Sequence, residues 1–396
     1  MPSRPTATKI VARLQKEGHI AYFAGGWVRD YLLKSPSDDI DIATSACVEE
    51  IQELFPKTIP VGIAFGIIIV VEDGFHFEIA TFRKEKEYTD GRRPSFIEKA
   101  SAEEDAQRRD FTINGLFFDP IEQKLLDFVG GVEDIKQGII KAIGDPHHRF
   151  LEDRLRMIRA VRYSTRFHFP IEFSTRQAIL SHAKSLFPAV AIERVWQELQ
   201  KMSRYPNFTN GLITLHELQL LQTIFPSLQD EPLPEIPSFA NNCPLILRLL
   251  YLFPKDSLEK HLELTEYLKL SKKEKEEVRF FHKAKSLLEM PLLWQEKVEN
   301  VEWAYFYAHP LSATLLDLFH LSHKEKIDLL APYIIRIQEK KPIVVADDLL
   351  KEGIPPGKTL GILLKEAEKI SINTLTEDKQ KILDTLKKGA LWPKEK

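Results

Sequence analysis

Residues 23–44 read FAGGWVRDYLLKSPSDDIDIAT and predict a strand, a tight glycine turn, a short helix, a loop and a second strand. Residues 20–23 are apolar and aromatic, as a buried strand should be. Gly25 and Gly26 follow directly, and paired glycines let a backbone turn sharply and approach a ligand closely. The helix expected over residues 27–33 would present free N–H groups and its positive dipole end at this turn, as phosphate-binding helices do.

Charged side chains in the same stretch point to nucleotide chemistry. Arg29 falls in the first turn of the expected helix and can add a guanidinium to the phosphate site. Asp39 and Asp41 are two residues apart on the expected second strand, so their carboxylates should face the same way. Two carboxylates with a triphosphate are what Mg²⁺ binds. A glycine pair alone is usually a plain turn, and an Asp-x-Asp alone is usually a solvated strand end. The order and close spacing of the two motifs are what indicate a nucleotide-binding site here.

Four ordered stretches resemble one known family. They are similar to the class II, bacterial-type tRNA nucleotidyltransferases (CCA-adding enzymes) and to the related bacterial poly(A) polymerases, within the DNA polymerase beta-like superfamily. The resemblance implies an α+β fold, with a polymerase-beta-like head of mixed sheet and helices followed by an all-helical neck, body and tail. It covers about the first half of the chain, in AYFAGGWVRDYLL (residues 21–33), DDIDIAT (38–44), RRDFTINGLFFDP (108–120) and FLEDRLRMIRAVRYSTRF (150–167), and more loosely in IERVWQELQKM (192–202).

Composition limits the class of protein. The 396 residues suffice for two to four domains, and the net charge of −3 means that a nucleic-acid surface must be local. Two distant cysteines, Cys47 and Cys243, exclude a disulfide framework and fit a reducing cytoplasm. The sequence has no long apolar run, so we expect no membrane association. We predict a nucleotidyltransferase head over 1–140, a nucleotide-selecting helical neck over 141–228, and a tRNA-binding body and tail over 229–396, with a proline-rich linker at 229–244.

A predicted hairpin supplies a possible third carboxylate. Residues 66–71 (GIIIVV) and 75–81 (FHFEIAT) read as two strands joined by an Asp-Gly turn. Alternation along the second strand turns Glu78 away from the apolar face, and the superfamily usually has a carboxylate on a strand next to the aspartate pair. Glu78 is therefore a candidate catalytic residue beside Asp39 and Asp41, with an exposed strand glutamate as the equal alternative.

A polar stretch follows at residues 82–106, and it predicts a mobile functional loop. In the family this position corresponds to a flexible loop that some CC-only enzymes lack. Its presence here favours an enzyme that can add the terminal A.

The RRD stretch adds candidate nucleotide ligands. Two arginines beside an aspartate could form a surface salt-bridge cluster. The resemblance implies instead that Arg109 contacts the incoming triphosphate, and that Asp110 and Asn114 hold the nucleotide sugar region and the local backbone.

Residues 146–167 predict a helix that selects the base. Asp145-Pro146 is a helix-start signal, and Asp153, Arg156, Arg159 and Arg162 follow one another at three-residue intervals. Asp153 and Arg156 should then be neighbours on one face, which is usually a solvated ion pair. Because they match the family's EDxxR motif, the resemblance implies that they read the incoming base, with Arg159 and Arg162 facing phosphates or shaping the pocket.

Hydrogen-bonding chemistry supports this role. Cytosine and adenine both present an amino donor and a ring-nitrogen acceptor, whereas a carboxylate only accepts and a guanidinium only donates. One Asp–Arg pair can therefore read both bases. Guanine and uracil would leave two groups unpaired, at about 1–3 kcal/mol each.

The sequence thus predicts a Mg²⁺-dependent enzyme that adds CMP and AMP from CTP and ATP to the 3′ end of tRNA, with Asp39 and Asp41 as metal ligands. The nearest alternative is a poly(A) polymerase or an A-only enzyme that shares the motifs. VGIAFGIIIV at residues 61–70 lacks the basic signature that bacterial poly(A) polymerases usually carry there, which favours the tRNA enzyme. A non-catalytic RNA-binding relative is disfavoured because the carboxylates and the Asp–Arg pair are all present.

Overall fold

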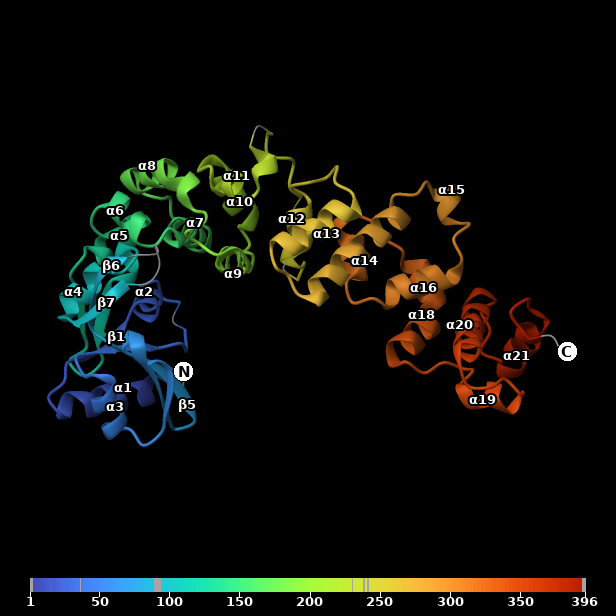
Figure 1. The fold of residues 1–396 in the computed structure, drawn as a ribbon, viewed down its shortest axis with the longest axis horizontal. Coiled ribbons are helices and arrows are strands. Elements are labelled where there is room, and N and C mark those ends of the chain that lie inside the picture. The colour runs from blue at the N-terminus through green and yellow to red at the C-terminus, as the bar shows by residue number, and fades with distance from the viewer. Residues whose placement is uncertain are drawn as a thin grey trace. The chain divides into compact units, whose positions relative to one another are not determined.

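The computed structural model describes residues 3–35, 37–88, 94–229, 231–237, 239–240 and 242–393, without the side chains of residues 64, 85–88 and 94–97. The chain forms two compact units, Met1–Leu233 and Pro234–Lys396 (Figure 1). Their boundary falls within the proline-rich stretch at residues 229–244. The finer division into head, neck and body stays a prediction.

The first unit is built on a mixed sheet of seven strands in the order β3-β4-β5-β2-β1-β8-β9 (Figure 1). Strands β2 and β5 are parallel, and the other neighbours are antiparallel. The strands predicted near residues 20–23, in the hairpin and after the RRD motif are confirmed. Their bounds are β1 (Ala21–Ala24), β2 (Asp41–Thr44), β3 (Thr58–Gly62), β4 (Ile67–Glu72), β5 (Phe75–Thr81), β8 (Leu116–Asp119) and β9 (Lys124–Asp127).

Helices cover one face of this sheet. One of them, α2 (Gly26–Leu32), leaves β1 directly after Gly25 and packs Trp27 and Val28 into this core. The apolar side of α1 (Ser3–Lys16) and the buried side of α3 (Val48–Leu54) pack against inward-facing side chains of the central strands (Figure 1). Phe23, Phe77 and Ile79 are each no more than 1% exposed in this core. Burial of such side chains stabilises the unit by about 1.5–3 kcal/mol each.

The opposite face of the sheet carries polar groups near its centre. On this face α4 (Ala102–Gln107) packs Ala106 against Phe117. This face is therefore only partly covered, which leaves room for a ligand.

Secondary structure occupies most of residues 82–106, so the prediction of a loop is wrong there, while the mobility and function of this stretch stay predictions. These residues form β6 (Arg83–Tyr88) and β7 (Pro94–Lys99), paired antiparallel, followed by α4. Ser101 and Glu104 form a capping box that fixes the start of α4, with Ser101 Oγ accepting from the Glu104 N–H at 3.2 Å. Residues 89–93 lie outside the described residues.

The predicted helix over 146–167 is two helices, which corrects the expected placement of Asp153. Helix α6 (Pro146–Glu152) ends at Asp153, whose backbone is extended, and α7 (Leu155–Phe167) begins after it. The Asp153 carboxylate accepts the Leu155 N–H at 3.1 Å, because an aspartate before a helix satisfies an N–H that lacks an intrahelical partner. Asp153 and Arg156 therefore do not share one helix face.

Further short helices complete the first unit. The predicted helix over residues 192–202 is confirmed, while the one over 212–221 is interrupted at Gln219, which has a positive φ of 60°. The elements are η1 (Ile63–Phe65), η2 (Thr112–Asn114), α5 (Gly131–Gln137), α8 (Phe173–His182), η3 (Ala183–Ser185), α9 (Ile192–Met202), α10 (Phe208–Glu217), α11 (Leu220–Ile224) and η4 (Pro226–Leu228).

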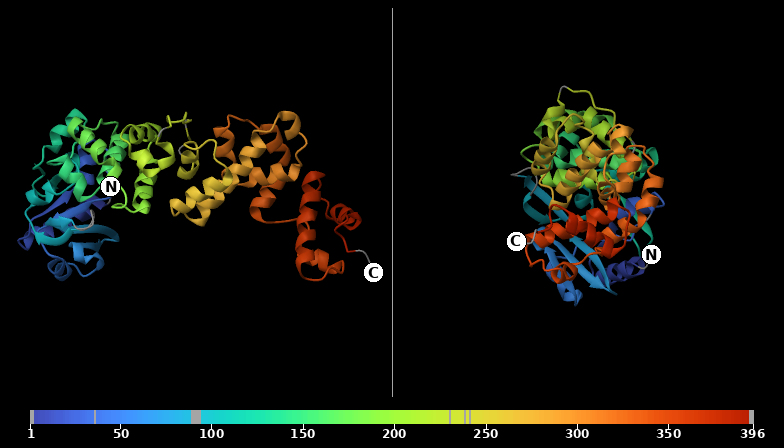
Figure 2. Two further views of the ribbon diagram at one scale, coloured as in Figure 1. Left: turned by 45° about the horizontal axis from the view of Figure 1, so that its top comes forward. Right: turned by 90° about the vertical axis from the view of Figure 1, so that its right-hand side faces the viewer.

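The second unit consists of helices and connecting loops in its described part (Figure 2). Within the described residues, no helix is long and apolar enough to cross a membrane. Its elements are α12 (Leu245–Leu250), α13 (Leu258–Tyr267), α14 (Lys272–Leu288), α15 (Leu292–Gln295), α16 (Asn300–Ala308), α17 (Ser312–Leu318), α18 (Lys324–Glu339), α19 (Ala346–Lys351), α20 (Lys358–Asn373) and α21 (Lys379–Lys388).

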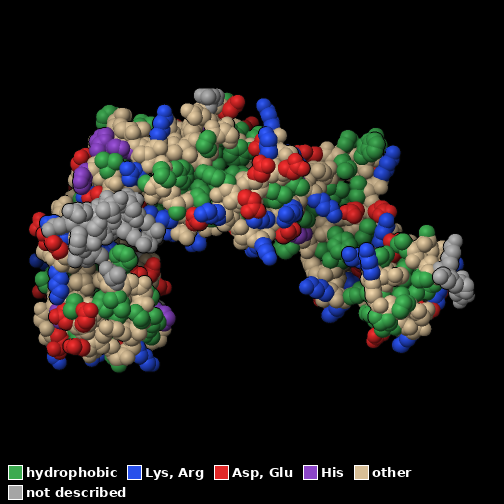
Figure 3. Space-filling model, in the orientation of Figure 1, with side chains coloured by type: hydrophobic (Ala, Val, Ile, Leu, Met, Phe, Trp, Pro, Cys, Tyr) green, Lys and Arg blue, Asp and Glu red, His purple; other side chains and the backbone are tan. Residues whose placement is uncertain are grey.

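Lysines on α14 are interleaved with acidic partners. Lys275 Nζ lies 2.6 Å from Glu266, and Lys283 Nζ lies 2.9 Å from Glu302. Figure 3 shows basic and acidic side chains mixed over the visible face of this unit. The arrangement favours a solvated, ion-paired helix over a continuous basic track for RNA.

Candidate active site

A pocket of about 650 Å³ lies on the partly covered face of the first unit. One part of its wall comes from the glycine turn and the central strands, and another from α7 and α9. Of the predicted site residues, all except Asp39 line it: Gly25, Gly26, Arg29, Asp41, Glu78, Arg109, Asp110, Asn114, Asp153, Arg156, Arg159 and Arg162.

The glycine turn allows a close approach at the pocket wall. Gly25 has a φ of 62°, and a Cβ on it would lie 2.7 Å from Nη1 of Arg109. A side chain at this position would therefore be strained and would collide with Arg109. Gly26 begins α2 and lines the pocket together with Gly25 and Arg109.

The acidic residues meet at the strand ends. Asp41 is the first residue of β2, and Asp39 precedes the strand rather than lying on it as predicted. Ile42 pairs with Ile79, so the preceding residues Asp41 and Glu78 lie side by side on one face. The pKa of Asp41 is raised to about 7, because the protein displaces part of its water and because Glu78 and Asp39 are like-charged, while Arg109 opposes the rise.

A buried aspartate that the sequence analysis missed holds the arginine pair. Asp105 on α4 is 1% exposed and accepts hydrogen bonds from Nε and Nη2 of Arg109 at 3.2 and 3.1 Å. It also pairs with Arg108 at 2.7 Å. The capping box at residues 101–104 could have revealed α4, and hence that Asp105 lies one turn before Arg109.

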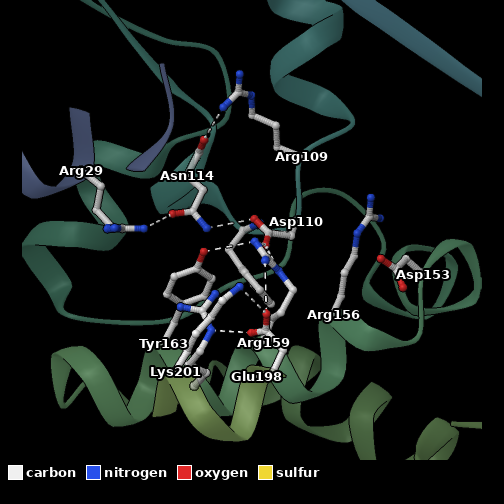
Figure 4. A network of polar contacts seen from close by, with 12 residues as sticks. Arg29, Arg109, Asp110, Asn114, Asp153, Arg156, Arg159, Tyr163, Glu198 and Lys201 are labelled. Carbon is white, nitrogen blue, oxygen red and sulfur yellow. Dashed lines mark hydrogen bonds and ion pairs between the residues drawn. The ribbon is translucent and has the colours of Figure 1, made fainter. Parts of the chain in front are cut away.

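Arg29 is held from two sides, and Figure 4 shows its contact with Asn114. Its Nε and Nη2 donate to the Asp30 carboxylate at 2.9 and 2.8 Å, and its Nη1 donates to the Asn114 side-chain oxygen at 2.5 Å. Arg166 on α7 donates to the other Asp30 oxygen at 2.8 Å. At 3% exposure, Arg29 is therefore mainly a buried link between α2, the RRD segment and α7.

Asp110 continues the same network toward the helices (Figure 4). It accepts from Asn114 Nδ2 at 2.9 Å and from Nη2 and Nε of Arg159 at 2.6 and 2.8 Å. Burial opposes ionisation of Asp110, but Arg159 and Asn114 outweigh it and hold the pKa of this carboxyl well below its usual range. Asp110 is thus a charged anchor between the RRD segment and α7.

Glu198 on α9 is a second residue that the sequence analysis missed. It is 3% exposed and accepts from Nε of Arg162 at 2.5 Å, and Arg159 Nη1 lies 4.0 Å from it. A glutamate on the buried side of an amphipathic helix, beside Val195 and Met202, was the available signal.

The proposed base-reading residues each have another partner. Asp153 accepts from Arg194 Nη2 at 3.1 Å, and Arg156 Nη1 donates to Glu152 at 2.6 Å. Both side chains still line the pocket (Figure 4). The expected i,i+3 ion pair is therefore replaced by two separate pairs, since the break at Asp153 redirects its carboxylate toward α9.

Comparisons with known proteins show which family the chain resembles. Residues 21–141 match the model of the poly A polymerase head domain, and residues 168–231 match a probable RNA- and SrmB-binding site of polymerase A. A CCA-adding enzyme of Lactobacillus helveticus is 33% identical over 390 residues, which cover 94% of each chain. The chain belongs to the CCA-adding enzyme family.

Other members of the CCA-adding enzyme family are similar to this chain over different lengths. The enzyme of Anoxybacillus flavithermus is 44% identical over 215 residues, so the matched stretch spans only about half of this chain and of that relative, 54% of each. The crystal structure of the Bacillus stearothermophilus CCA-adding enzyme in complex with CTP has a TM-score of 0.74 at 28% identity and covers 98% of each chain.

Membership of this family implies a divalent metal ion, and the acidic residues fit one. Among the described residues, no group of three or more potential ligands is already arranged to hold a metal. A metal that binds substrate phosphates, however, needs only one or two protein carboxylates. Burial and, after it, repulsion by Glu78 and Asp39 raise the pKa of Asp41, and a bound cation would relieve that repulsion.

Proposed function

We propose that this protein adds CMP and AMP from CTP and ATP to the 3′ end of tRNA and thereby builds the CCA terminus without a nucleic-acid template. The observation that carries the proposal is that one pocket is lined by Asp41 and Glu78, by the glycine turn with Arg109, and by Asp153 and Arg156. These are the groups needed to bind a metal, a triphosphate and a base.

The roles of the residues follow from their places in the pocket. Asp41, with Asp39 and Glu78, would hold Mg²⁺, which when bound supplies stabilisation of charge on the phosphate oxygens and activation of the attacking hydroxyl. The N–H groups after Gly25 and the Arg109 guanidinium orient the triphosphate. The RNA 3′-hydroxyl attacks the α-phosphorus, the bond to the bridging oxygen breaks, and pyrophosphate leaves.

Base selection rests on Asp153 and Arg156. The carboxylate accepts the amino group of cytosine or adenine, and the guanidinium donates to the adjacent ring nitrogen. Arg194 and Glu152 hold these two side chains in the absence of nucleotide, so a bound base shares or replaces those contacts. Arg159 and Arg162 shape the wall behind them through Asp110 and Glu198.

Three tRNA transcripts test the proposal. They end before CCA, after C and after CC, and each is incubated with the protein and Mg²⁺ in the presence of CTP, ATP or both. We expect completion to CCA on all three. Addition of A to the CC-ended transcript alone would identify an A-adding enzyme, long A tails on any RNA would identify a poly(A) polymerase, and no incorporation at all would leave a non-catalytic RNA-binding relative.

A further inference from the structure

The strand register places an apolar surface beside the acidic residues. Ile59 on β3 pairs with Ile69 on β4, and Ile69 pairs with Glu78 on β5. Directly paired residues share a face, and Glu78 neighbours Asp41 on that face. Ile59, Ile69, Glu78 and Asp41 therefore form one row across four strands.

The apolar end of this row is not buried by the helices that cover the sheet. Ile68 and Val70, which point the other way, are fully buried in the core against α1 and α3. In contrast, Ile59 is 41% exposed and Ile69 is half-buried. Ile67 lies on the same face as Ile69 and lines the pocket. We name Ile59, Ile67 and Ile69 the isoleucine shelf.

The acidic residues separate the shelf from the triphosphate groups. In the order β1-β2-β5-β4-β3, the glycine turn follows β1, Asp41 and Glu78 lie on β2 and β5, and the shelf lies on β4 and β3. Adjacent strands are about 4.8 Å apart, so Ile69 lies about 10 Å from Asp41 along the sheet, on the side away from Gly25.

The chemistry requires the two substrates to occupy opposite sides of the reacting phosphorus. In an in-line displacement the attacking hydroxyl and the leaving pyrophosphate lie on opposite sides of the transferred group. With the pyrophosphate toward Gly25 and Arg109, the RNA must approach over β5 and β4. We propose that the isoleucine shelf receives the 3′-terminal nucleobase of the RNA acceptor, an inference that rests on the proposed function.

The shelf suits an acceptor whose last base changes during synthesis. Isoleucine side chains offer contact area without hydrogen-bond donors or acceptors, so they hold the face of any base without reading its edge. Base identity is then read only for the incoming nucleotide, at Asp153 and Arg156. One acceptor site can thereby serve each successive addition.

Photo-crosslinking tests the placement without requiring turnover. A tRNA transcript that lacks CCA and carries 4-thiouridine as its last base is irradiated with the protein, and the modified peptide is identified by mass spectrometry. We expect the crosslink within residues 58–72. A crosslink confined to α7 or α9, or none at all, would overturn the inference. A shelf crosslink in a protein that adds no nucleotide would instead refute the proposed function alone.

Substitutions test the contribution of the shelf to catalysis. Ile59→Ser and Ile69→Ser should each raise the KM for the RNA acceptor about 5- to 10-fold and leave the KM for CTP unchanged. The matched control is Ile121→Ser, because Ile121 is 47% exposed in the turn between β8 and β9 of the same sheet. An unchanged acceptor KM in both shelf variants would contradict the proposal.

An acceptor without its last base separates this contact from a folding defect. If the shelf binds that base, an acceptor with an abasic 3′-terminal nucleotide should raise the acceptor KM of the wild-type protein about as much as Ile69→Ser does with the normal acceptor. The abasic acceptor and Ile69→Ser together should then raise the KM no further than either change alone. Additive losses would show that the isoleucine acts elsewhere.

Discussion

Arg194 on α9 donates a hydrogen bond to Asp153 at 3.1 Å, so the carboxylate proposed to read the base is held by a helix other than the one that carries Arg156. The Asp153 side chain belongs to the junction between α6 and α7, where its orientation depends on this contact and on the Leu155 N–H. Selection of the base should therefore depend on α9 as well as on the EDxxR motif.

Asp153→Ala should relax the choice of base. The variant loses the acceptor for the amino group, which costs about 1–3 kcal/mol and corresponds to roughly a 5- to 150-fold fall in the preference for CTP over UTP. Arg194→Ala should give a smaller fall in the same direction, and Arg194→Lys should restore part of it. Ratios of kcat/KM for CTP and UTP measure the effect, and an unchanged ratio in Asp153→Ala would refute the template role.

Asp41→Asn should abolish nucleotide addition while making the metal-free protein more stable. The substitution removes a carboxylate that Glu78 and Asp39 repel. We expect a rise in melting temperature of about 2–4 °C, which corresponds to about 1 kcal/mol for a unit of this size. Differential scanning fluorimetry in EDTA measures it. Full activity in the variant would contradict the role of Asp41 as a metal ligand. A lower melting temperature would contradict the repulsion between Asp41 and its acidic neighbours.

Glu198→Ala should strongly destabilise the first unit. Arg162 and Glu198 have side chains only 7% and 4% exposed, and removal of the glutamate leaves a buried guanidinium without its counter-charge. Breaking a buried pair in this way costs about 3–5 kcal/mol. Lys201→Ala is the matched control, because Lys201 pairs with the same glutamate but is 51% exposed, and its loss should cost under about 1 kcal/mol. Urea unfolding followed by circular dichroism compares them.

Glu172→Gln should alter the acid dependence of stability. Burial opposes ionisation of Glu172, but hydrogen bonds from Ser174 and Thr175 at the start of α8 outweigh it and lower its pKa to about 2. Because the folded-state pKa is depressed, the stabilisation is complete above the unfolded-state pKa of about 4.3 and is lost as the pH falls toward 2.

The difference in unfolding free energy between wild type and Glu172→Gln should therefore shrink as the pH falls from about 5 to 2. Subtraction of the two curves removes contributions from other carboxyl groups such as Asp110. A difference that stays constant over this range would show that the carboxylate does not act through its charge.

Local sequence signals determined much of the fold and the membership of the site. Alternating apolar residues around Asp73-Gly74 specify the hairpin, because an Asp-Gly turn fixes the register of the two strands. The glycine pair after an apolar strand specifies the turn at Gly25, where only glycine fits against Arg109. Predicted residues from four separate motifs line one pocket.

Partners in that pocket were decided only by tertiary structure. Periodicity placed Asp153 beside Arg156, but α6 ends before Asp153. The Asp153 carboxylate accepts the Leu155 N–H at the start of α7 and a second hydrogen bond from Arg194, which is 41 residues away in sequence. Glu198 becomes an anchor because Arg162, which is 36 residues away in sequence, meets it in the folded chain. Asp105 pairs with the nearby Arg108 and Arg109, and burial of its side chain makes it their anchor. The sequence by itself thus determined which groups are available, whereas packing of α4, α7 and α9 decided which charges pair, since ion pairs between distant segments leave no local pattern.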